Sequence, residues 1–441
     1  MTAPAEARPR IGALWPLVPG VVVIAVVAGA LTSPLLTAVG ALGLGVLAVS
    51  VRWPLATGIA FLIAGPMYLS EFEVGPMTLD NVAVLYGSAL AVAWLLGRTW
   101  QVPPVAAWPI ALALAATVAA VANGGAGAAG IVRFASLAVT AVVVANAGPH
   151  ARRTAAAGLE AAVTLGALVL LAQPLTGFPD PYQTWGEGVG LRYGGLFGHP
   201  NFAAYTVSLV LLYQLYTRRF TAWRAASAVC LLLALVLTGS RAALLVFALL
   251  MVPALWLRAR RFFLLLVPAV LALPFVGETI ITRFEVISQT GGLSGSNASG
   301  WRFGQWADAL AATRGHEFFG IGWGQTREVL TDNLGAHSTY IQIWLEVGRV
   351  GAALAAVGLV LLIRSARSHV ARILVAYAVL TGISDPVLVY PCCATALLVL
   401  LAALHTPAGD EEASAPDGAA TPAPGTPTPS VPARRPEVLS R

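Results

Sequence analysis

The sequence contains no lysine, and charged residues of all kinds make up only 10% of its 441 positions. Soluble domains carry roughly 25% charged residues, so this scarcity excludes an ordinary soluble protein. Hydrophobic residues account for 58% of the chain, and the mean hydropathy is +0.78. Nearly every apolar run approaches the ~20 residues that a helix needs to cross a bilayer. We therefore predict an all-α polytopic membrane protein.

Cysteine is also scarce. The three cysteines, Cys230, Cys392 and Cys393, fall within predicted membrane spans, and two of them are adjacent. Since this arrangement lacks the spacing of a metal site, we interpret all three as small apolar residues. The chain has no Gly-x-x-x-x-Gly-Lys phosphate loop, no metal-spaced His/Cys/Asp set and no nucleophile elbow. We therefore expect no metal and no cofactor.

The apolar runs predict about fourteen membrane spans, or twelve if two short early spans merge. They lie near residues 13–31, 34–51, 54–70, 82–97, 103–122, 131–149, 154–173, 199–217, 223–237, 242–257, 262–277, 338–363, 370–384 and 391–405. Arginines cluster at every second connection between these runs. The positive-inside rule then places both termini in the cytoplasm. The net charge of +6 therefore reports membrane topology, and we expect no nucleic-acid partner.

Two connections on the exterior side are long, 174–198 and 278–337. In the second, Phe303, Trp306, Ala307 and Leu310 recur at helical spacing, which predicts one or two short amphipathic helices over the membrane surface. Residues 288–300 are rich in Ser, Gly and Asn and suggest a flexible lead-in. We divide the chain into N-terminal spans (1–189), a membrane domain that includes the large exterior loop (190–405), and a disordered cytoplasmic tail (406–441).

His337 stands where the large exterior loop returns to the membrane. In a helix starting near this residue, the helical repeat places one stripe of side chains on a single face: His337, Tyr340, Ile341, Trp344, Gly348 and Gly351. The two glycines would allow a neighbouring helix or lipid to approach closely. Glu346 points to nearly the opposite side, so we expect it to pair with Arg349 instead. His337 is either an interfacial residue that caps the helix or a catalytic group.

Several arginines fall on the predicted exterior side, where the positive-inside rule predicts few: Arg133, Arg192, Arg241 and Arg302. A charge at the membrane centre costs roughly 2.5–3.5 kcal/mol on insertion scales. Guanidinium groups that face a cavity could offset this cost by gripping phosphate oxygens. The alternative for each is snorkelling to the lipid headgroups. For Arg192 and Arg241, which lie close to glycines suited to tight turns, we favour the functional interpretation.

Three other polar residues lie near exterior helix ends. In Gly198-His199-Pro200-Asn201, Pro200 suits the first turn of a helix, and Asn201 can donate and accept near the helix start. His199 is either a second acid/base group or an interfacial residue. Asp385, in Ser-Asp-Pro, is either a local cap or a catalytic carboxylate.

Taken in order, these residues resemble the O-antigen ligase family, whose domain is shared with some bacterial polysaccharide polymerases. The family signature is His, then Asn, Ser or Gln, nine residues, and Gly-x-x-Gly; His337-Ser338, Gly348 and Gly351 match it. Ala352 departs from the Gly, Thr or Tyr that often follows. Further similar features span roughly residues 190–355: Phe-Gly-His-Pro-Asn at 197–201, Thr-Gly-Ser-Arg at 238–241, and Arg302 with Trp306 ahead of Phe-Gly-Ile-Gly at 319–322.

The resemblance implies a GT-C-like membrane glycosyltransferase of the cell envelope that needs no metal. Its donor would be a glycan on a polyprenyl diphosphate such as undecaprenyl diphosphate, and its acceptor a glycan, lipid or protein. His337 would be the general base, and Arg192, Arg241 and Arg302 would bind the diphosphate. Arg133, His199, Asn201, Tyr340, Gly348 and Gly351 would support the site. The reaction would invert the anomeric centre at the outer face of the cytoplasmic membrane, among membrane lipids.

Ligation of a finished glycan and polymerisation of repeat units remain equally open. A transporter or flippase is the main alternative from another class, but such proteins place charges near the bilayer midplane, often in paired repeats. We find no convincing internal repeat. A non-catalytic assembly subunit is a third possibility, and it would tolerate the loss of His337.

Overall fold

The computed structural model describes residues 45–68, 73–74, 77–181, 192–217, 221–251, 298–330 and 335–405. The predicted spans 13–31 and 262–277, most of the lead-in at 288–300 and the predicted tail 406–441 lie outside these ranges.

The described part of the chain is helical apart from a two-residue antiparallel pair, β1 (Glu73–Val74) with β2 (Met77–Thr78). Its N-terminal α-helices are α3 (Pro54–Tyr68), α4 (Leu79–Leu95), α5 (Ala107–Ala122), α6 (Ala128–Asn146) and α7 (Pro149–Thr176). They are followed by α8 (Pro200–Tyr216), α9 (Ala222–Thr238), the helix Arg241–Met251, α11 (Ala298–Ala312), α12 (Thr326–Val329), α13 (Thr339–Ser365), α14 (His369–Thr381) and α15 (Pro391–Ala403). Short 3-10 turns are η3 (Pro104–Ala106) and η4 (Gly195–Phe197).

Long apolar helices confirm the prediction of an all-α membrane protein. Among the described residues, four helices are long and apolar enough to cross a bilayer: Pro104–Ala122, Ala128–Asn146, Pro149–Thr176 and Thr339–Ser365. Shorter apolar helices occupy other predicted spans: Pro54–Tyr68, Leu79–Leu95, Ala222–Thr238, Arg241–Met251, His369–Thr381 and Pro391–Ala403. The total of twelve to fourteen spans stays a prediction.

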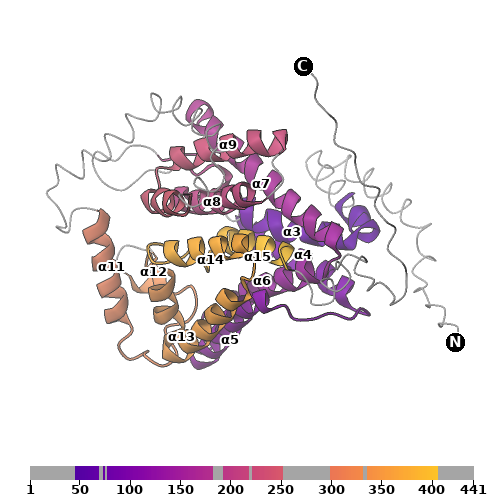
Figure 1. Cartoon of the computed structure of the whole chain (residues 1–441). Coiled ribbons are helices and arrows are strands. Elements are labelled where there is room, and N and C mark those ends of the chain that lie inside the picture. The colour runs from indigo at the N-terminus through magenta and orange to yellow at the C-terminus, as the bar shows by residue number, and fades with distance from the viewer. Residues whose placement is uncertain are drawn as a thin grey trace, which may run out of the picture. The chain divides into compact units, whose positions relative to one another are not determined.

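The helices pack around α8 and α15, whose side chains are almost all buried. α15 contacts α6, α7 and α8, while α13 packs along α5, and α3 packs along α4. In Figure 1, α8, α14 and α15 run side by side, and α11 runs across their direction. Alanine and glycine at the contacts permit close packing: a Cβ on Gly358 of α13 would lie 2.5 Å from the Ala111 Cβ of α5.

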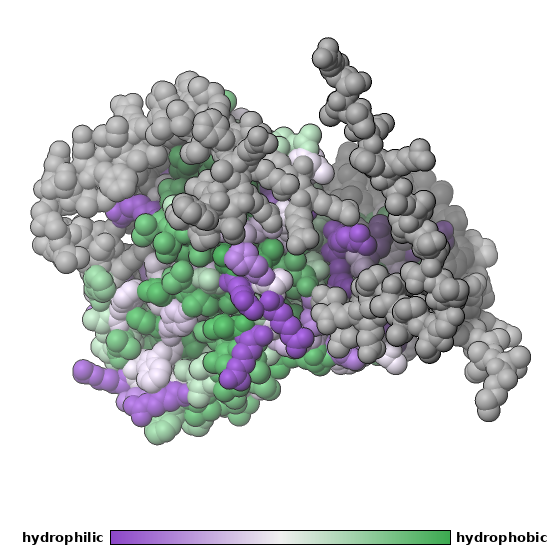
Figure 2. Space-filling model, viewed as in Figure 1, coloured by the Kyte–Doolittle hydropathy of each residue, from purple (hydrophilic) through white to green (hydrophobic). Residues whose placement is uncertain are grey.

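Large apolar side chains remain exposed on the outside of these helices. They include Leu114 of α5, Leu165 of α7, Leu245 of Arg241–Met251 and Val357 of α13, each more than half exposed. In Figure 2, hydrophobic residues cover most of the described surface on one face, and strongly hydrophilic residues form small groups. An apolar exterior of this extent is unfavourable in water and suits a helix bundle surrounded by lipid.

α13 is broken at Gly348, which has φ 64° and ψ −168°. The segment 317–322 fills the break: Ile321 and Gly322 donate backbone N–H groups to the carbonyls of Leu345 and Glu346, both at 3.0 Å. A Cβ on Gly348 would lie 2.4 Å from the backbone nitrogen of Gly320. The predicted single stripe along this helix is therefore wrong beyond Val347, because a loop inserts where the helix would continue.

The predicted pairing of Glu346 with Arg349 is also wrong. Glu346 is fully buried and accepts hydrogen bonds from Thr326 Oγ1 (2.5 Å) and Gln342 Nε2 (3.3 Å). The guanidinium of Arg349 lies over the ring of Phe318, 5.6 Å from its centroid. Because Gly348 leaves the helical conformation, the i, i+3 geometry needed for a Glu346–Arg349 pair does not form.

The described residues of the connection 278–337 contain two short helices, α11 and α12. Their position over a membrane surface stays a prediction. On α11, Gln305 and Ala309 are buried, while Phe303 and Leu310 are 56% and 50% exposed. The apolar stripe read from the sequence therefore faces outward, and small or polar residues face α13.

Candidate functional site

His337 and Asp385 form the centre of the site. His337 precedes α13 with a left-handed backbone (φ 46°), a conformation that is uncommon outside glycine. Its Nδ1 atom lies 3.2 Å from Asp385 Oδ1. The Asp385 side chain is 2% exposed, whereas that of His337 is 18% exposed. The pair therefore joins a buried carboxylate to a mostly buried imidazole, whose Nε2 atom is shielded from solvent.

The turn between α14 and α15, which carries Asp385, is tied directly to the start of α13. The backbone N–H of Thr339 donates to the Gly382 carbonyl (2.8 Å), and Thr339 Oγ1 donates to the Asp385 carbonyl (3.0 Å). At the next residue, the Tyr340 hydroxyl donates to the Val379 carbonyl of α14 (2.8 Å). These bonds fix the backbones around His337 and Asp385 relative to each other. Tyr340 contributes by anchoring the start of α13 to α14.

The beginning of α8 supplies the next partners of Asp385. Asn201 Nδ2 lies 3.3 Å from Asp385 Oδ2, and the Tyr205 hydroxyl donates to the same oxygen. The predicted helix start is confirmed: Pro200 lies in the first turn, and His199 is the N-cap, whose Nδ1 accepts from the Asn201 N–H at 3.1 Å. His199 thus orients Asn201 through the backbone.

Arg192 joins this network through the amide of Asn201. Its Nη2 atom donates to Asn201 Oδ1 at 2.6 Å, and its Nε atom donates to the Thr238 carbonyl at 3.2 Å. Thr238 ends α9, and Arg241 begins the next helix three residues later, with its side chain exposed. The structure therefore brings Arg192 to the turn that carries Arg241, although the two are far apart in the sequence.

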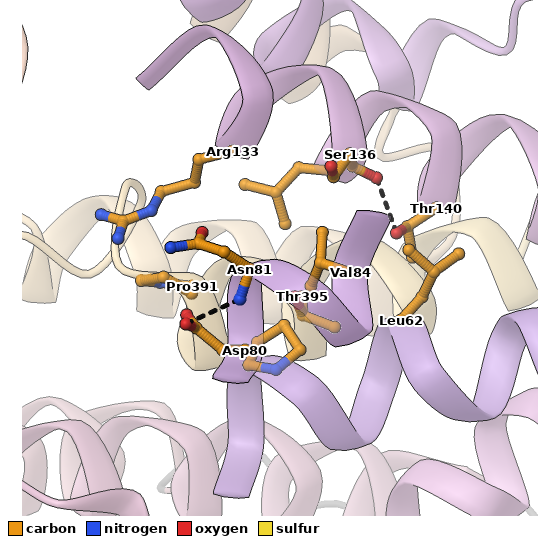
Figure 3. Close-up of a pocket in the computed structure, with 11 residues that line it drawn as sticks. Leu62, Asp80, Asn81, Val84, Arg133, Ser136, Thr140, Pro391 and Thr395 are labelled. Carbon is orange, nitrogen blue, oxygen red and sulfur yellow. Dashed lines mark hydrogen bonds between the residues drawn. The ribbon is translucent and has the colours of Figure 1, made fainter. Parts of the chain in front are cut away.

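The other two predicted arginines are placed differently. Arg302 lies in α11, and its side chain falls outside the described part of the structure. Arg133 of α6 lines a pocket with Asp80 and Asn81, the first residues of α4, beside Pro391 of α15 (Figure 3). His337 does not line this pocket. Arg133 therefore belongs to a separate pocket with both apolar and polar lining residues.

The two signature glycines serve close packing. Gly348 admits the loop 317–322, as described above. Gly351 faces α5, where an added Cβ would lie 3.2 Å from the Ala115 Cβ and would crowd Val347 of its own helix at 2.4 Å. The expected close approach of a neighbouring helix is confirmed for Gly351, while a loop takes that place at Gly348.

The arrangement combines an acid/base group with anion-binding groups. A buried carboxylate beside Nδ1 fixes the ring and the tautomer of an imidazole, which leaves the other nitrogen for proton transfer. The guanidinium fork of Arg192 suits planar oxyanions such as phosphate. Among the described residues, no group of three or more His, Cys, Asp or Glu side chains could hold a metal ion.

A family model decides the relationship. The model described as O-antigen ligase matches residues 226–356, which include Arg241, Arg302, His337 and both signature glycines. The match covers less than half of the chain and shows that this segment is similar to the O-antigen ligase family. The chain has no significant match among curated proteins. The O-antigen ligase match ends before Asp385 and begins after Arg192 and Asn201, so these three join the site through the fold.

Sequence reasoning underestimated Asp385, which lies 48 residues from His337. The available signal was a carboxylate beside an exterior turn in an otherwise apolar region. Tyr205 carried no such signal, because an aromatic residue within an apolar helix looks like any core residue. Only packing of α8 against the α14–α15 turn makes it a partner of Asp385.

Proposed function

We propose that the chain is a membrane glycosyltransferase that transfers or polymerises a glycan from a polyprenyl-diphosphate-linked donor onto an acceptor hydroxyl. The O-antigen ligase match supports a ligase or polymerase of lipid-linked glycans. The contact between His337 and Asp385, joined through Asn201 to Arg192, is the observation that carries the proposal. It places a candidate base and a phosphate-binding fork in one hydrogen-bonded network.

His337 acts as the general base. With Nδ1–H donated to Asp385, the lone pair of the neutral imidazole is on Nε2, which accepts the proton of the acceptor hydroxyl. The carboxylate then stabilises the imidazolium that forms. Asn201 and Tyr205 donate to Asp385 and hold it in the orientation that His337 needs.

The arginines act on the leaving group. Arg192, which contacts the Thr238 carbonyl at the end of α9, and Arg241, which begins the next helix, bind the donor diphosphate together with Arg302 of α11. Their positive charge stabilises the negative charge that develops as the lipid diphosphate departs, without a metal ion. Arg133, which lines its own pocket with Asp80 and Asn81, is assigned a supporting electrostatic role.

The proposed reaction is a single displacement at the anomeric carbon. The acceptor oxygen forms a bond to the anomeric carbon while the bond from that carbon to the diphosphate oxygen breaks. The proton moves from the acceptor to His337, and the electron pair leaves with the lipid diphosphate. Attack opposite the leaving group inverts the anomeric centre. The site faces the exterior of the cytoplasmic membrane, and both termini are cytoplasmic.

The position of the polar residues favours this function over transport. Asn201 begins α8, His337 precedes α13, and Asp385 lies between α14 and α15. These positions are helix ends, and in the proposed topology they lie toward the outer membrane surface, whereas transporters bind substrates near the bilayer midplane.

Substitution of His337 tests the proposal. We expect His337→Ala to lower the rate of transfer by about 10²–10⁴-fold, the usual contribution of a general base. The lipid-linked glycan should accumulate, and the transferred or elongated product should disappear. Arg241→Ala should also cause donor accumulation, through weaker donor binding.

His316→Ala and Arg314→Ala are matched controls, because both residues lie on the same exterior loop with exposed side chains. They should leave product levels unchanged at equal expression. Wild-type product from His337→Ala would rule out the general base. Product length then distinguishes ligation from polymerisation.

A further inference from the structure

Gln173 joins both sides of the first exterior loop at the end of α7. Its side-chain amide is buried, with the residue only 1% exposed. Nε2 donates to the carbonyls of Pro179 (2.6 Å) and Asp180 (3.3 Å), while Oε1 accepts the backbone N–H of Gly195 (2.9 Å). One side chain therefore connects residues before and after the segment 182–191.

These contacts match the hydrogen-bonding capacity of a primary amide. Two N–H groups face carbonyl oxygens, and the amide oxygen faces an N–H group. A carboxylate at this position would turn an oxygen toward the Pro179 and Asp180 carbonyls, and an apolar side chain would leave all three backbone groups without this partner. Buried backbone groups that lose a partner cost roughly 1–3 kcal/mol each.

The turn held by Gln173 lies tightly on α7. Gly195 has φ 55°, and a Cβ there would lie 2.8 Å from the Leu170 Cβ and 3.0 Å from its Cα. Nearby, a Cβ on Gly166 would lie 2.7 Å from the ring of Phe197. The turn 194–197 therefore packs closely against α7. The hydrogen bond from the Gly195 N–H to Gln173 Oε1 fixes the position of this turn.

Arg192 lies three residues before Gly195, on the same short stretch. Its guanidinium donates to both Asn201 Oδ1 and the Thr238 carbonyl, which belong to different helices. We propose that Gln173 is a positioning residue that closes the base of the first exterior loop and so presents Arg192 to the donor diphosphate. This inference rests on the proposed function of Arg192.

The chain offers a matched amide at another helix end. Asn146 closes α6, where its Oδ1 accepts from the Gln101 N–H (2.9 Å) and its Nδ2 donates to the Gln101 carbonyl (2.7 Å). Both amides tie a loop backbone to the end of a helix, but the hydrogen bonds of Gln101 lead to Asn146 and not to the His337 network. Asn146→Ala therefore reports the effect of losing such a tie away from the site.

The test uses the full-length protein in lipid nanodiscs and measures binding of undecaprenyl diphosphate as the probe. We expect Gln173→Leu and Gln173→Glu to weaken probe binding by about tenfold, a difference of roughly 1.4 kcal/mol. In a transfer assay, KM for the donor should rise while kcat changes by less than threefold. Asn146→Ala should change neither quantity.

A double substitution tests whether Gln173 works through Arg192. If it does, Gln173→Leu should weaken probe binding no further when Arg192 is already alanine, because coupled residues are non-additive. Additive losses, or probe binding by Gln173→Leu equal to wild type, would overturn the inference.

Hydrogen exchange separates this inference from the proposed function. The Gly195 amide should exchange at least tenfold faster in Gln173→Leu than in wild type, with or without the probe. A wild-type protein that does not bind the probe would overturn the proposed function, and unchanged exchange at Gly195 would overturn the loop closure by Gln173.

Discussion

α8 has a buried polar network at each end, and the two differ in how they use an arginine and a carboxylate. At its start, Asn201 and Tyr205 belong to the network of His337, Asp385 and Arg192, called here the His337 network. Near its end, Gln214 belongs to the Glu160 network, which consists of Glu160, Thr164, Gln214, Arg224 and Ser227. Thirteen residues of helix separate Asn201 from Gln214, or about 20 Å at ~1.5 Å per residue.

In the Glu160 network, the arginine and the carboxylate bind each other directly. Arg224 Nη2 lies 2.6 Å from Glu160 Oε1, and its Nε lies 3.0 Å from Oε2. Gln214 Nε2 donates to the same Glu160 Oε2 at 3.1 Å and to Ser227 Oγ at 3.0 Å. This bidentate pair links α7, α8 and α9, and its charges compensate each other within the protein.

In the His337 network, the amide of Asn201 stands between the arginine and the carboxylate. Arg192 donates to the amide oxygen, and the amide nitrogen faces Asp385. Through this amide the guanidinium is linked to Asp385, whose carboxylate also contacts His337. The comparison teaches that the same residue types can join helices by pairing directly or can be linked through a neutral amide, and the second arrangement suits the proposed reaction.

Asp385→Asn should produce the largest effect and act on the reaction. The amide can no longer stabilise the imidazolium of His337, so we expect kcat to fall by roughly 10²–10⁴-fold, the range for general-base catalysis. Steady-state transfer rates and thermal unfolding in detergent provide the measurement. A variant that unfolds at the wild-type temperature but keeps wild-type kcat would contradict the role of Asp385.

Glu160→Ala should produce a large loss of stability without a loss of kcat. Removing one partner of a fully buried ion pair costs about 3–5 kcal/mol, and the 20% exposure of the Arg224 side chain lowers that cost here. We expect a lower thermal midpoint and less folded protein, with kcat per folded molecule unchanged. Replacing both partners, Glu160→Leu with Arg224→Leu, should recover much of the lost stability. Loss of kcat at full stability would place the Glu160 network in the reaction.

Arg192→Lys should produce the smallest effect of the three. Lysine keeps the charge but cannot donate from a rigid fork to Asn201 and Thr238 together. We expect KM for the lipid-linked donor to rise about tenfold, a change of roughly 1.4 kcal/mol, with little change in kcat. Arg314→Lys, on an exposed arginine, is the matched control. Equal KM values for both variants would show that Arg192 does not contribute to donor binding.

Hydropathy alone located most of the described helices. The predicted spans 103–122, 199–217 and 338–363 correspond to Pro104–Ala122, Pro200–Tyr216 and Thr339–Ser365. Apolar runs bounded by arginine, glycine and proline are strong local signals. The break at Gly348 was not predictable in this way, since a glycine in a helical pattern is compatible with a continuous helix until a loop is known to fill the gap.

The residues of the candidate site also fall into two groups, those that the sequence predicts and those that only the packing of helices brings together. His337 could be found from its place at the return of the exterior loop, and Arg192 and Arg241 from charge against the topological bias. Their partners could not. Thr238, Tyr205 and Asp385 reach these residues only through contacts between helices, and local sequence patterns carry no record of which helix ends meet.

The sequence by itself determined that this chain lies in a membrane, where most of its described helices lie, and which charged residues are costly enough to need an explanation. The scarcity of charge and the length of apolar runs suffice for these conclusions, because transfer into lipid depends on local composition. Tertiary structure alone decided that Asp385 faces His337 and that Asn201 separates Arg192 from that carboxylate. Such contacts depend on the packing of α8 against the α14–α15 turn, and packing is a property of the whole fold.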